Sequence, residues 1–408
     1  MQEKNTHISR RSFIKSAAAV GLGSALAPLA ELSEAHAATP AEAAGITAVP
    51  TRPFGRSGIQ VPILSLGGMF DIPSNQTLLK QAMRWGVTYW DTAHVYSGGR
   101  SEAGIGQYFK SYTEHREKIF LVTKSTARNG RGMSQDLATS LERMNTDHID
   151  LFFVHGISDA EIMDSGMREW AAEQKAEGKI RLFGFSTHSN MERCLLEAAR
   201  LNWVDGIMMT YNFRLMHENR MKEAVKACVD AGIGLTAMKT QGGGAVDATT
   251  SRELELAGRF VQKGFTDKQA KLKAVWENPQ ISAICSQMPT MSILMANIAA
   301  AVDRTSLTDN ERQHLEHYAT ETFSHYCAGC TQICQNAIAG NVPVGDVMRY
   351  LMYARNYGDS NDARRRFAAL PDAVRRQMRQ ADYSAAEARC PRRLPIARLM
   401  GEALEDLA

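Results

Sequence analysis

Residues 149–155 read Ile149-Asp150-Leu151-Phe152-Phe153-Val154-His155, a short apolar run that ends in a histidine. A run this apolar predicts a strand with both faces covered, as in a parallel sheet. Seven similar segments surround it in the chain and are also predicted as strands: Ile63–Leu66, Val87–Trp90, Ile119–Thr123, Ile180–Phe185, Gly206–Thr210, Ile233–Met238 and Ile281–Ser286.

Amphipathic stretches separate these strands, among them Asn75–Arg84, Met133–Arg143 and Met191–Ala199, which carry apolar residues at helical spacing. Eight β/α units in succession predict an α/β fold of the closed (β/α)8 TIM-barrel type. An open doubly wound sheet lacks support, because no Gly-x-Gly-x-x-Gly follows the first strand. The segment Thr51–Val61 predicts a hairpin that closes the N-terminal end of the barrel.

The chain is long enough for the barrel and a smaller unit, since it has 408 residues and a barrel takes about 250. We divide it into a signal peptide (1–37), a linker (38–50), the barrel (51–305) and a helical, cysteine-bearing domain (306–408). The formal net charge of +3 leaves no nucleic-acid footprint. Beyond the N-terminus no apolar run of about 18 residues predicts a membrane span in the mature chain.

The N-terminal segment has the layout of an export signal. Paired arginines in Ser9-Arg10-Arg11-Ser12-Phe13 precede an Ala- and Gly-rich stretch, and Ala35-His36-Ala37 offers small residues to a signal peptidase. The pair resembles a twin-arginine (Tat) signal, with a basic disordered tail as the alternative. We therefore expect the chain to use the Tat translocon and to reach the periplasm.

Four ionisable side chains are predicted to meet at one rim of the barrel, since chemistry in this fold collects at the C-terminal ends of the strands. The second strand ends in Asp91, with Tyr96 in the loop that follows it. The third strand ends in Lys124 and the fourth in His155. This pattern predicts an acid–base site. The structural alternative is an Asp91–Lys124 ion pair with a satisfied histidine nearby.

Such a set suits the reduction of a carbonyl, which needs a hydride on carbon and a proton on oxygen. An ammonium beside a phenol favours the phenolate, so we expect Lys124 to lower the pKa of Tyr96 from about 10. The tyrosine would then serve as a general acid. Asp91 is the natural partner of a buried Lys124, and His155 would orient the carbonyl oxygen.

The motifs around these residues resemble those of the aldo/keto reductases, over about residues 51–302. The strings that carry the resemblance are Trp90-Asp91-Thr92-Ala93-His94-Val95-Tyr96, Ser101-Glu102, Val122-Thr123-Lys124 and Asp150-Leu151-Phe152-Phe153-Val154-His155. The resemblance implies Tyr96 as proton donor, His155 as substrate-orienting residue and Asp91 with Lys124 as tuning pair. It also implies an extended NAD(P) that lies across the rim.

The cofactor pocket departs from the family pattern. A Ser-Asn pair and a Gln usually hold the nicotinamide carboxamide, whereas this chain keeps Ser186 but has Thr187 and Met208 at the other two positions. Met238 replaces an aromatic residue that often stacks on the ring, and Lys239 follows it. The remaining candidates for cofactor contact are Tyr211, Gly243, Gln287 and Asn297.

Two of these positions bear on the form of the cofactor. The loop around Gly243 could offer backbone N–H groups to a pyrophosphate, or it could be a flexible glycine loop. NADP-preferring relatives place a Lys and an Arg on the 2′-phosphate, where this chain has Gln287 and Ile293. Because both charge-assisted contacts are lost, we expect weak or no preference for NADPH over NADH.

Four of the seven cysteines lie in the tail: Cys327, Cys330, Cys334 and Cys390. Their spacing resembles one cluster-binding set of the two-cluster ferredoxins, with one extra residue between the second and third Cys. Helices are predicted between them over Gly345–Ala354, Asp362–Leu370 and Asp372–Ala381, which indicates an α-helical ferredoxin-like domain. An aldo/keto reductase subgroup carries such a tail. We expect a [4Fe–4S] cluster, with structural zinc and disulfides or free thiols as alternatives.

These patterns predict an exported oxidoreductase that reduces an aldehyde or ketone, or oxidises the alcohol, by hydride transfer with NAD(P)(H). A small carbonyl compound is the expected substrate, and the loops at the rim do not identify it. The alternative is a barrel protein without turnover, built around the iron–sulfur cluster, which passes electrons to a partner.

Overall fold

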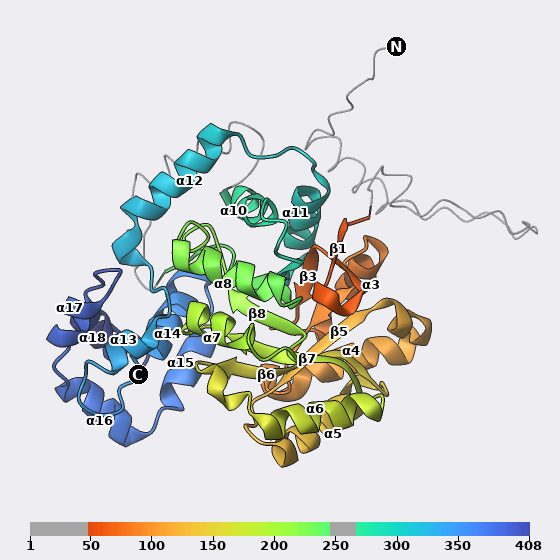
Figure 1. Cartoon of the computed structure of the whole chain (residues 1–408), viewed down its shortest axis with the longest axis horizontal. Helices are drawn as coiled ribbons and strands as arrows, with labels where there is room; N and C mark the ends of the chain where they lie inside the picture. Colours follow the sequence, from red (N-terminus) through yellow and green to blue (C-terminus); the bar gives the residue numbers. More distant parts are fainter. Residues whose placement is uncertain (1–47, 245–266) are drawn as a thin grey trace, which may run out of the picture.

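The computed structural model describes residues 48–244 and 267–408. Eight parallel strands close into a barrel in the order β10-β3-β4-β5-β6-β7-β8-β9 (Figure 1). Their bounds are Leu64–Gly67 (β3), Tyr89–Asp91 (β4), Phe120–Ser125 (β5), Ile149–Ile157 (β6), Ile180–Thr187 (β7), Gly206–Thr210 (β8), Gly234–Met238 (β9) and Ala283–Gln287 (β10). The eight predicted strands and the closed barrel are confirmed. The predicted signal peptide and most of the linker lie outside the described residues.

The alternation of side chains along each strand separates two cores. On β6, Leu151 and Phe153 join the cluster that fills the inside of the barrel. Phe152 and Val154 join the larger cluster between the strands and the outer helices. Every residue of β6 from Ile149 to Val154 is buried, as expected for a strand covered on both faces.

The outer layer consists of helices that alternate with the strands: α3 (Gln76–Arg84), α4 (Arg100–Ser111), α5 (Gly130–Met144), α6 (Ser165–Ala176), α7 (Met191–Ala198), α8 (Asn219–Asp230), α10 (Asp267–Trp276) and α11 (Met291–Val302). Helix α5 shows why these segments are helical. The Asn129 side chain caps its first turn by accepting from the N–H of Gly132. Met133, Leu137 and Met144 then form one buried face.

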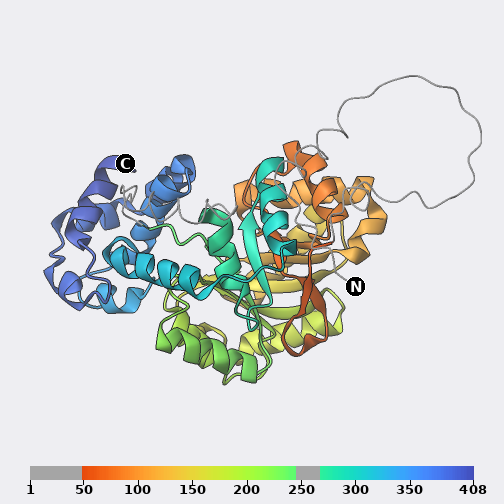
Figure 2. The same cartoon turned by 90° about the horizontal axis from the view of Figure 1, so that it is seen from above.

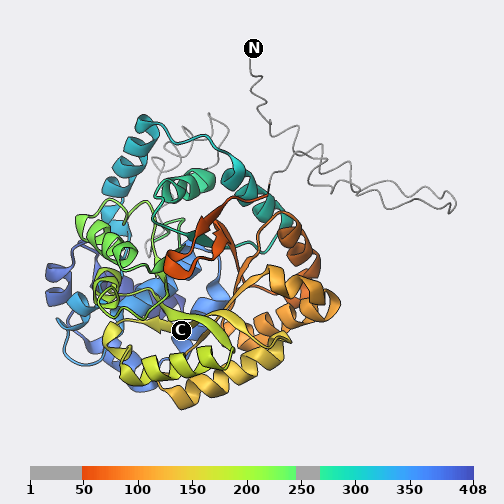
Figure 3. The same cartoon turned by 45° about the vertical axis from the view of Figure 1, so that its right-hand side comes forward.

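An N-terminal hairpin closes one end of the barrel, as predicted. Its strands are β1 (Thr51–Pro53) and β2 (Gln60–Pro62), and in Figure 3 it lies across the ring of strands. The ring of Phe54 fills the barrel end against two glycines. A Cβ on Gly234 or Gly206 would come within 2.5 Å or 2.8 Å of that ring, so both positions require glycine.

The C-terminal segment forms a helical unit. Its helices are α12 (Asp309–Glu321), α13 (Thr331–Gln335), α14 (Val344–Asn356), α15 (Ser360–Ala368), α16 (Asp372–Gln380), α17 (Ser384–Arg389) and α18 (Ile396–Asp406). Helix α12 packs on the barrel through Leu315 and Tyr318, which contact Phe213. The later helices enclose a core of their own. The three helices predicted in the tail are present.

This unit lies over the C-terminal ends of the strands, at the end of the barrel opposite the hairpin (Figure 2). The backbone N–H of Asn190, which follows β7, donates to Gly329 O at 2.8 Å. The Asn212 amide, which follows β8, donates to Tyr326 Oη at 2.9 Å. The helical unit therefore covers the rim at which the active site was predicted. In the described ranges, no helix is long and apolar enough to cross a membrane.

Candidate active site

A buried ion pair lies at the centre of the rim. Lys124 Nζ is 2.6 Å and 2.7 Å from the two carboxylate oxygens of Asp91, and 2.6 Å from Thr92 O. These three bonds use every proton of the ammonium. Burial alone would lower the pKa of Lys124, but the Asp91 carboxylate raises it above its usual value. Lys124 is therefore held as a cation.

Tyr96 lies above this pair, in the turn Tyr96–Gly99 that follows β4. Lys124 Nζ is 4.9 Å from the centre of its ring. Burial nevertheless raises the pKa of Tyr96 to about 12, against the opposing effect of Lys124. The expectation that Lys124 makes this phenol more acidic than usual is therefore wrong, because desolvation outweighs the ammonium. Tyr96 keeps its proton at neutral pH.

His155 faces Tyr96 from β6. The two rings are T-shaped, with centroids 5.6 Å apart. Burial, with a contribution from Lys124, lowers the pKa of His155 well below its usual value, so the imidazole is neutral. Its Nδ1 is buried and has no hydrogen-bond partner among the described residues. The structure thus brings Asp91, Tyr96, Lys124 and His155 together.

Several residues predicted to contact the cofactor, at the ends of strands β7 and β10 and on helix α11, bond within the protein. Ser186 Oγ accepts from the N–H of Gly156 at 2.9 Å, which leaves the Ser186 hydroxyl proton available to a ligand. Thr187 Oγ1 donates to Ser189 O at 2.7 Å. Asn297 donates to the Ser286 hydroxyl at 3.0 Å, and Gln287 to Met69 O at 2.6 Å.

One cofactor candidate, Tyr211, is not placed to receive a ligand at the rim. Tyr211 lies in the core between the strands and the helices, where its hydroxyl accepts from Asn278 at 2.9 Å. The predicted role of Tyr211 is therefore corrected. Gly243 packs closely against the helical unit, since a Cβ there would come within 2.8 Å of Asn356 Cβ, and it lines a cavity between the strand ends and α14. By contrast, Met208 and Met238 line the inner core of the barrel.

The helical unit adds residues to the rim that the sequence did not indicate. Lys239 Nζ donates to Tyr353 Oη on α14 at 2.9 Å. Arg349 lies one turn earlier on the same helix, and Arg366 on α15 lies over the Tyr353 ring at 5.8 Å. The i, i+4 spacing of Arg349 and Tyr353 places them on one helix face. Nothing in the spacing indicates that this face meets the barrel.

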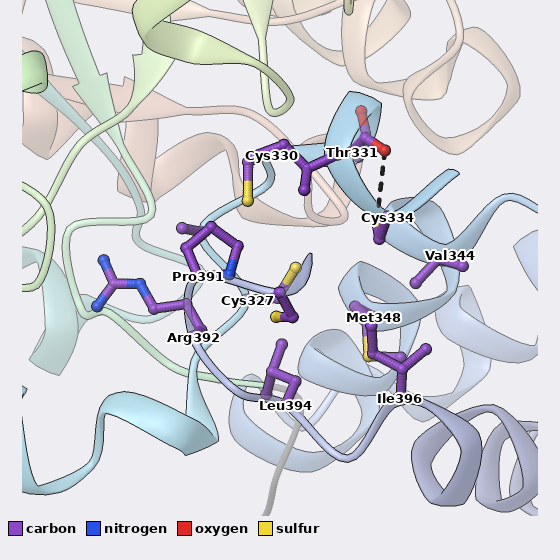
Figure 4. A pocket seen from close by; sticks show the side chains of 14 residues that line it. Cys327, Cys330, Thr331, Cys334, Val344, Met348, Pro391, Arg392, Leu394 and Ile396 are labelled. Carbon is purple, nitrogen blue, oxygen red and sulfur yellow. Dashed lines mark hydrogen bonds between the residues drawn. The ribbon is translucent and has the colours of Figure 1, made fainter. Parts of the chain in front are cut away.

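The four tail cysteines line one cavity within the helical unit. Figure 4 shows Cys327, Cys330 and Cys334 around the same hollow, with Pro391 and Leu394 along its edge; Cys390 also lines it. Burial raises the pKa of the Cys327, Cys330 and Cys334 thiols to about 12. All seven cysteines are free thiols in this structure. Within the described ranges, no three His, Cys, Asp or Glu side chains are grouped so that they could hold a metal ion.

Comparison with known proteins supports this description. The model of the aldo/keto reductase family matches residues 64–308, which is more than half of the chain. The model of the twin-arginine translocation signal matches residues 7–27, which supports Tat-dependent export.

Curated relatives include the aldo-keto reductase AMT2 of Alternaria alternata, 28% identical over 45% of this chain and 62% of that protein. The aldo-keto reductase yakc [NADP(+)] of Schizosaccharomyces pombe is 30% identical over 48% of this chain and 62% of that protein. The chain thus spans less than two thirds of the length of these relatives.

Among solved structures, the aldo-keto reductase AKR11C1 from Bacillus halodurans has a TM-score of 0.55 and 23% identity, over 66% of this chain and 96% of that chain. The thermostable aldo-keto reductase Tm1743 has the same TM-score at 25% identity, over 66% of this chain and 99% of that one. These likenesses cover the barrel fold. By the family match over residues 64–308, the chain belongs to the aldo/keto reductase family.

Proposed function

We propose that this protein is an exported oxidoreductase that reduces an aldehyde or ketone, or oxidises the corresponding alcohol, with NAD(P)(H). One observation carries the proposal: a protonated Tyr96 and a neutral His155 meet above the buried Asp91–Lys124 pair. A carbonyl oxygen placed between the two rings would have a proton donor on one side and an imidazole on the other.

The four side chains have separate roles in this reaction. When bound, NAD(P)H would supply the hydride for the carbonyl carbon. Tyr96 donates its hydroxyl proton to the carbonyl oxygen, and the neutral imidazole of His155 can donate a hydrogen bond that fixes this oxygen. Lys124, 4.9 Å from the Tyr96 ring centre, stabilises the phenolate that remains. Asp91 keeps Lys124 charged, and solvent restores the proton of Tyr96.

The residues fit the nicotinamide end of the cofactor better than its diphosphate. Ser186 retains a proton to donate to a carboxamide, and Met238 offers an apolar surface beside the rim. We propose that the cofactor is faced by Ser186, Thr187, Met238, Lys239, Gly243, Gln287 and Asn297. Tyr211 is left out, because its side chain is buried in the core.

A Tyr96→Phe variant tests the proposed reaction. We expect reduction of an aromatic aldehyde panel to fall by about 10²–10⁴-fold, the usual contribution of a general acid, with nicotinamide binding retained. Tyr112→Phe, the same exchange at the end of α4, is the matched control and should keep its turnover. Full turnover in Tyr96→Phe would contradict the proposal. Tight nicotinamide binding without turnover in the wild type would favour the alternative barrel without catalysis.

We also infer that Cys327, Cys330, Cys334 and Cys390 hold a [4Fe–4S] cluster in a ferredoxin-like domain. All four thiol-bearing residues line one hollow, together with Met348, Leu394 and Ile396. Four sulfurs on one zinc ion each lie about 2.3 Å from the metal, which requires a compact group. A hollow ringed by cysteines suits a larger group with four thiolate ligands. Such a cluster could be structural or could exchange electrons with a partner protein.

Anaerobic purification with iron and sulfide assays tests the cluster. We expect about four iron and four sulfide per chain, the content of a [4Fe–4S] cluster with four Cys ligands, and loss of most of both in Cys390→Ala. Cys228→Ala, on the barrel helix α8, is the matched control and should retain them. A colourless protein with tightly bound zinc would contradict the inference.

We propose the periplasm as the destination. The match of a Tat signal to residues 7–27 supports this location. Replacement of Arg10 and Arg11 by lysine should retain the protein in the cytoplasm in a fractionation experiment, because the paired arginines identify the signal. Equal amounts of both forms in the periplasmic fraction would contradict a Tat route.

A further inference from the structure

The turn that carries Tyr96 has an unusual backbone. Ser97, Gly98 and Gly99 follow it with positive φ angles of +51°, +65° and +91°. Ser97 alone among these three carries a Cβ, which crowds the following carbonyl in the left-handed region. A non-glycine residue keeps this conformation only where the surrounding structure holds it. The position of the Tyr96 phenol therefore depends on what supports the turn.

Arg143 of α5 contacts this turn from outside the barrel. Its Nη1 donates to the backbone oxygen of His94 at 3.0 Å, two residues before Tyr96. Its guanidinium also lies against Gly99, three residues after Tyr96, where a Cβ would come within 2.5 Å of Arg143 Cζ. Any residue other than glycine at this position would displace the guanidinium. Arg143 thus contacts the turn on both sides of Tyr96.

A buried carboxylate holds Arg143 in this position. Glu102, in the first turn of α4, is 0% exposed. Its Oε2 accepts from Arg143 Nη1 at 3.1 Å, and its Oε1 accepts from Thr123 Oγ1 at 2.7 Å. Nη1 carries two protons, one for Glu102 and one for the backbone of the turn. The Glu102–Arg143 pair therefore joins α4, α5 and the turn.

The same contacts reach the strand that carries Lys124. Thr123, which binds the buried carboxylate, and Ser125 flank Lys124 on β5. Alternation along the strand turns both side chains outward where Lys124 points inward. Ser125 Oγ donates to Asp136 of α5 at 2.5 Å, and Asp136 lies 3.4 Å from His94 Nε2. The outer helices thus connect β5, on both sides of Lys124, to the turn that follows β4.

We propose that Glu102 and Arg143 are positioning residues, which hold the Tyr96 hydroxyl where it can transfer its proton to the carbonyl oxygen. The inference rests on the proposed function, in which Tyr96 is the proton donor. Both residues lie behind the turn, so they act through Tyr96 rather than on the substrate. A displacement of about 1 Å in a reacting group can cost about 10²-fold in rate.

A double-mutant cycle between Arg143 and Tyr96 tests this role. We expect Arg143→Met to lower kcat for reduction of the aromatic aldehyde panel by about 10–100-fold, with KM changed by less than about threefold. In the Tyr96→Phe background the same exchange should change the residual rate by less than about twofold, because the hydroxyl that it positions is gone. Arg143→Lys keeps a cation beside Glu102 and should recover part of the loss.

Arg116→Met is the matched control for loss of a guanidinium. Arg116 pairs with the buried carboxylate of Asp150 at 3.0 Å and donates to the backbone oxygen of His148 at 2.7 Å. It precedes β5 and so lies at the opposite end of that strand from Lys124. We expect Arg116→Met to lower the melting temperature and to keep kcat.

Gly98 and Gly99 provide a second comparison, which removes no charge. Both have positive φ, so alanine strains the backbone at either position. A Cβ on Gly98 meets no atom within 4 Å, whereas a Cβ on Gly99 meets the Arg143 guanidinium. We expect Gly99→Ala to lower kcat about tenfold more than Gly98→Ala does. This pair tests the contact even where Arg143→Met does not fold.

Three outcomes would overturn the proposal. Arg143→Met could slow reduction equally with and without the Tyr96 hydroxyl, Arg116→Met could lower kcat as much as Arg143→Met, or the two alanine variants could have equal effects. Each would show that Arg143 supports the fold and not the position of Tyr96. A failure of the proposed reaction would instead appear as unchanged turnover in Tyr96→Phe, whatever Arg143→Met does.

Discussion

The rings of Tyr96 and His155 meet at 76° with their centroids 5.6 Å apart. Tyr96 comes from the turn after β4 and His155 from β6, so the barrel holds the pair at a fixed distance. Between those strands, β5 carries Lys124 to the underside of the Tyr96 ring. Three neighbouring strands therefore define one point at which a carbonyl oxygen can be protonated and oriented.

The pKa values of this pair predict the pH dependence of reduction. The reaction needs a protonated Tyr96, whose pKa is raised to about 12, and a neutral His155, whose pKa lies well below its usual value. We expect kcat/KM for reduction to be level from about pH 7 to about pH 10 and to fall as the pH approaches the pKa of Tyr96. Stopped-flow or steady-state assays over this range provide the measurement. A decline in kcat/KM that is centred between about pH 7 and pH 9, and that is absent in Tyr96→Phe, would contradict the raised pKa of Tyr96.

Two histidines at the rim, His155 and His188, predict a loss of stability in acid. Burial, aided by Lys239, lowers the pKa of His188 well below its usual value, as it does for His155. Below about pH 6.5 the unfolded chain gains protons at these positions that the native state does not. The free energy of unfolding should therefore fall with decreasing pH, by up to about 2 kcal/mol per histidine between pH 6.5 and pH 5.

Urea unfolding at a series of pH values measures this effect. His188→Gln should flatten the decline, because it removes one of the two groups. His317→Gln, at an exposed position on α12, should leave the slope unchanged. A slope in His188→Gln equal to that of the wild type would show that His188 is not held neutral.

The Asp91–Lys124 pair predicts a strong dependence of stability on both partners. Lys124 is 1% exposed and Asp91 3% exposed. Lys124→Met leaves the carboxylate buried without a cation, and we expect a loss of about 3–5 kcal/mol in the free energy of unfolding. The double variant Asp91→Asn/Lys124→Met removes both charges and should recover part of this loss. Denaturant titration that finds the double variant less stable than the single one would contradict this account.

The strands and the acid–base residues were predictable because both depend on local pattern. Each buried strand is a short apolar run, and parallel strands bring their C-terminal ends to one rim. The pKa of Tyr96 was not predictable in this way, since it depends on burial by distant segments. Tyr211 was misplaced because the face on which a side chain lies changes with every residue near a strand end.

The sequence also did not predict that the helical unit covers the rim of the barrel. The helices of the tail follow from their apolar periodicity, but periodicity does not show which surface they cover. The contacts that dock the unit are dispersed pairs, such as Arg392 with Glu218 and Asn212 with Tyr326. Their partners are separated by 174 and 114 residues in the chain. No local pattern connects residues so far apart.

Two side chains, Gln287 and Ile293, predict little preference between NADH and NADPH. Gln287 donates to Met69 O, and Ile293 is 40% exposed on α11, so neither position presents a cation. We expect dissociation constants for NADPH and NADH within about tenfold of each other by titration, and a larger preference for NADPH would contradict this.

The double variant Gln287→Lys/Ile293→Arg adds two charge-assisted contacts and should shift the preference toward NADPH. Val229→Arg, at an exposed position on α8, adds charge elsewhere and should not. If both variants shift the preference equally, net charge rather than a 2′-phosphate site would be responsible. If neither variant shifts it, the 2′-phosphate lies away from α11 and the family alignment of these two positions is wrong.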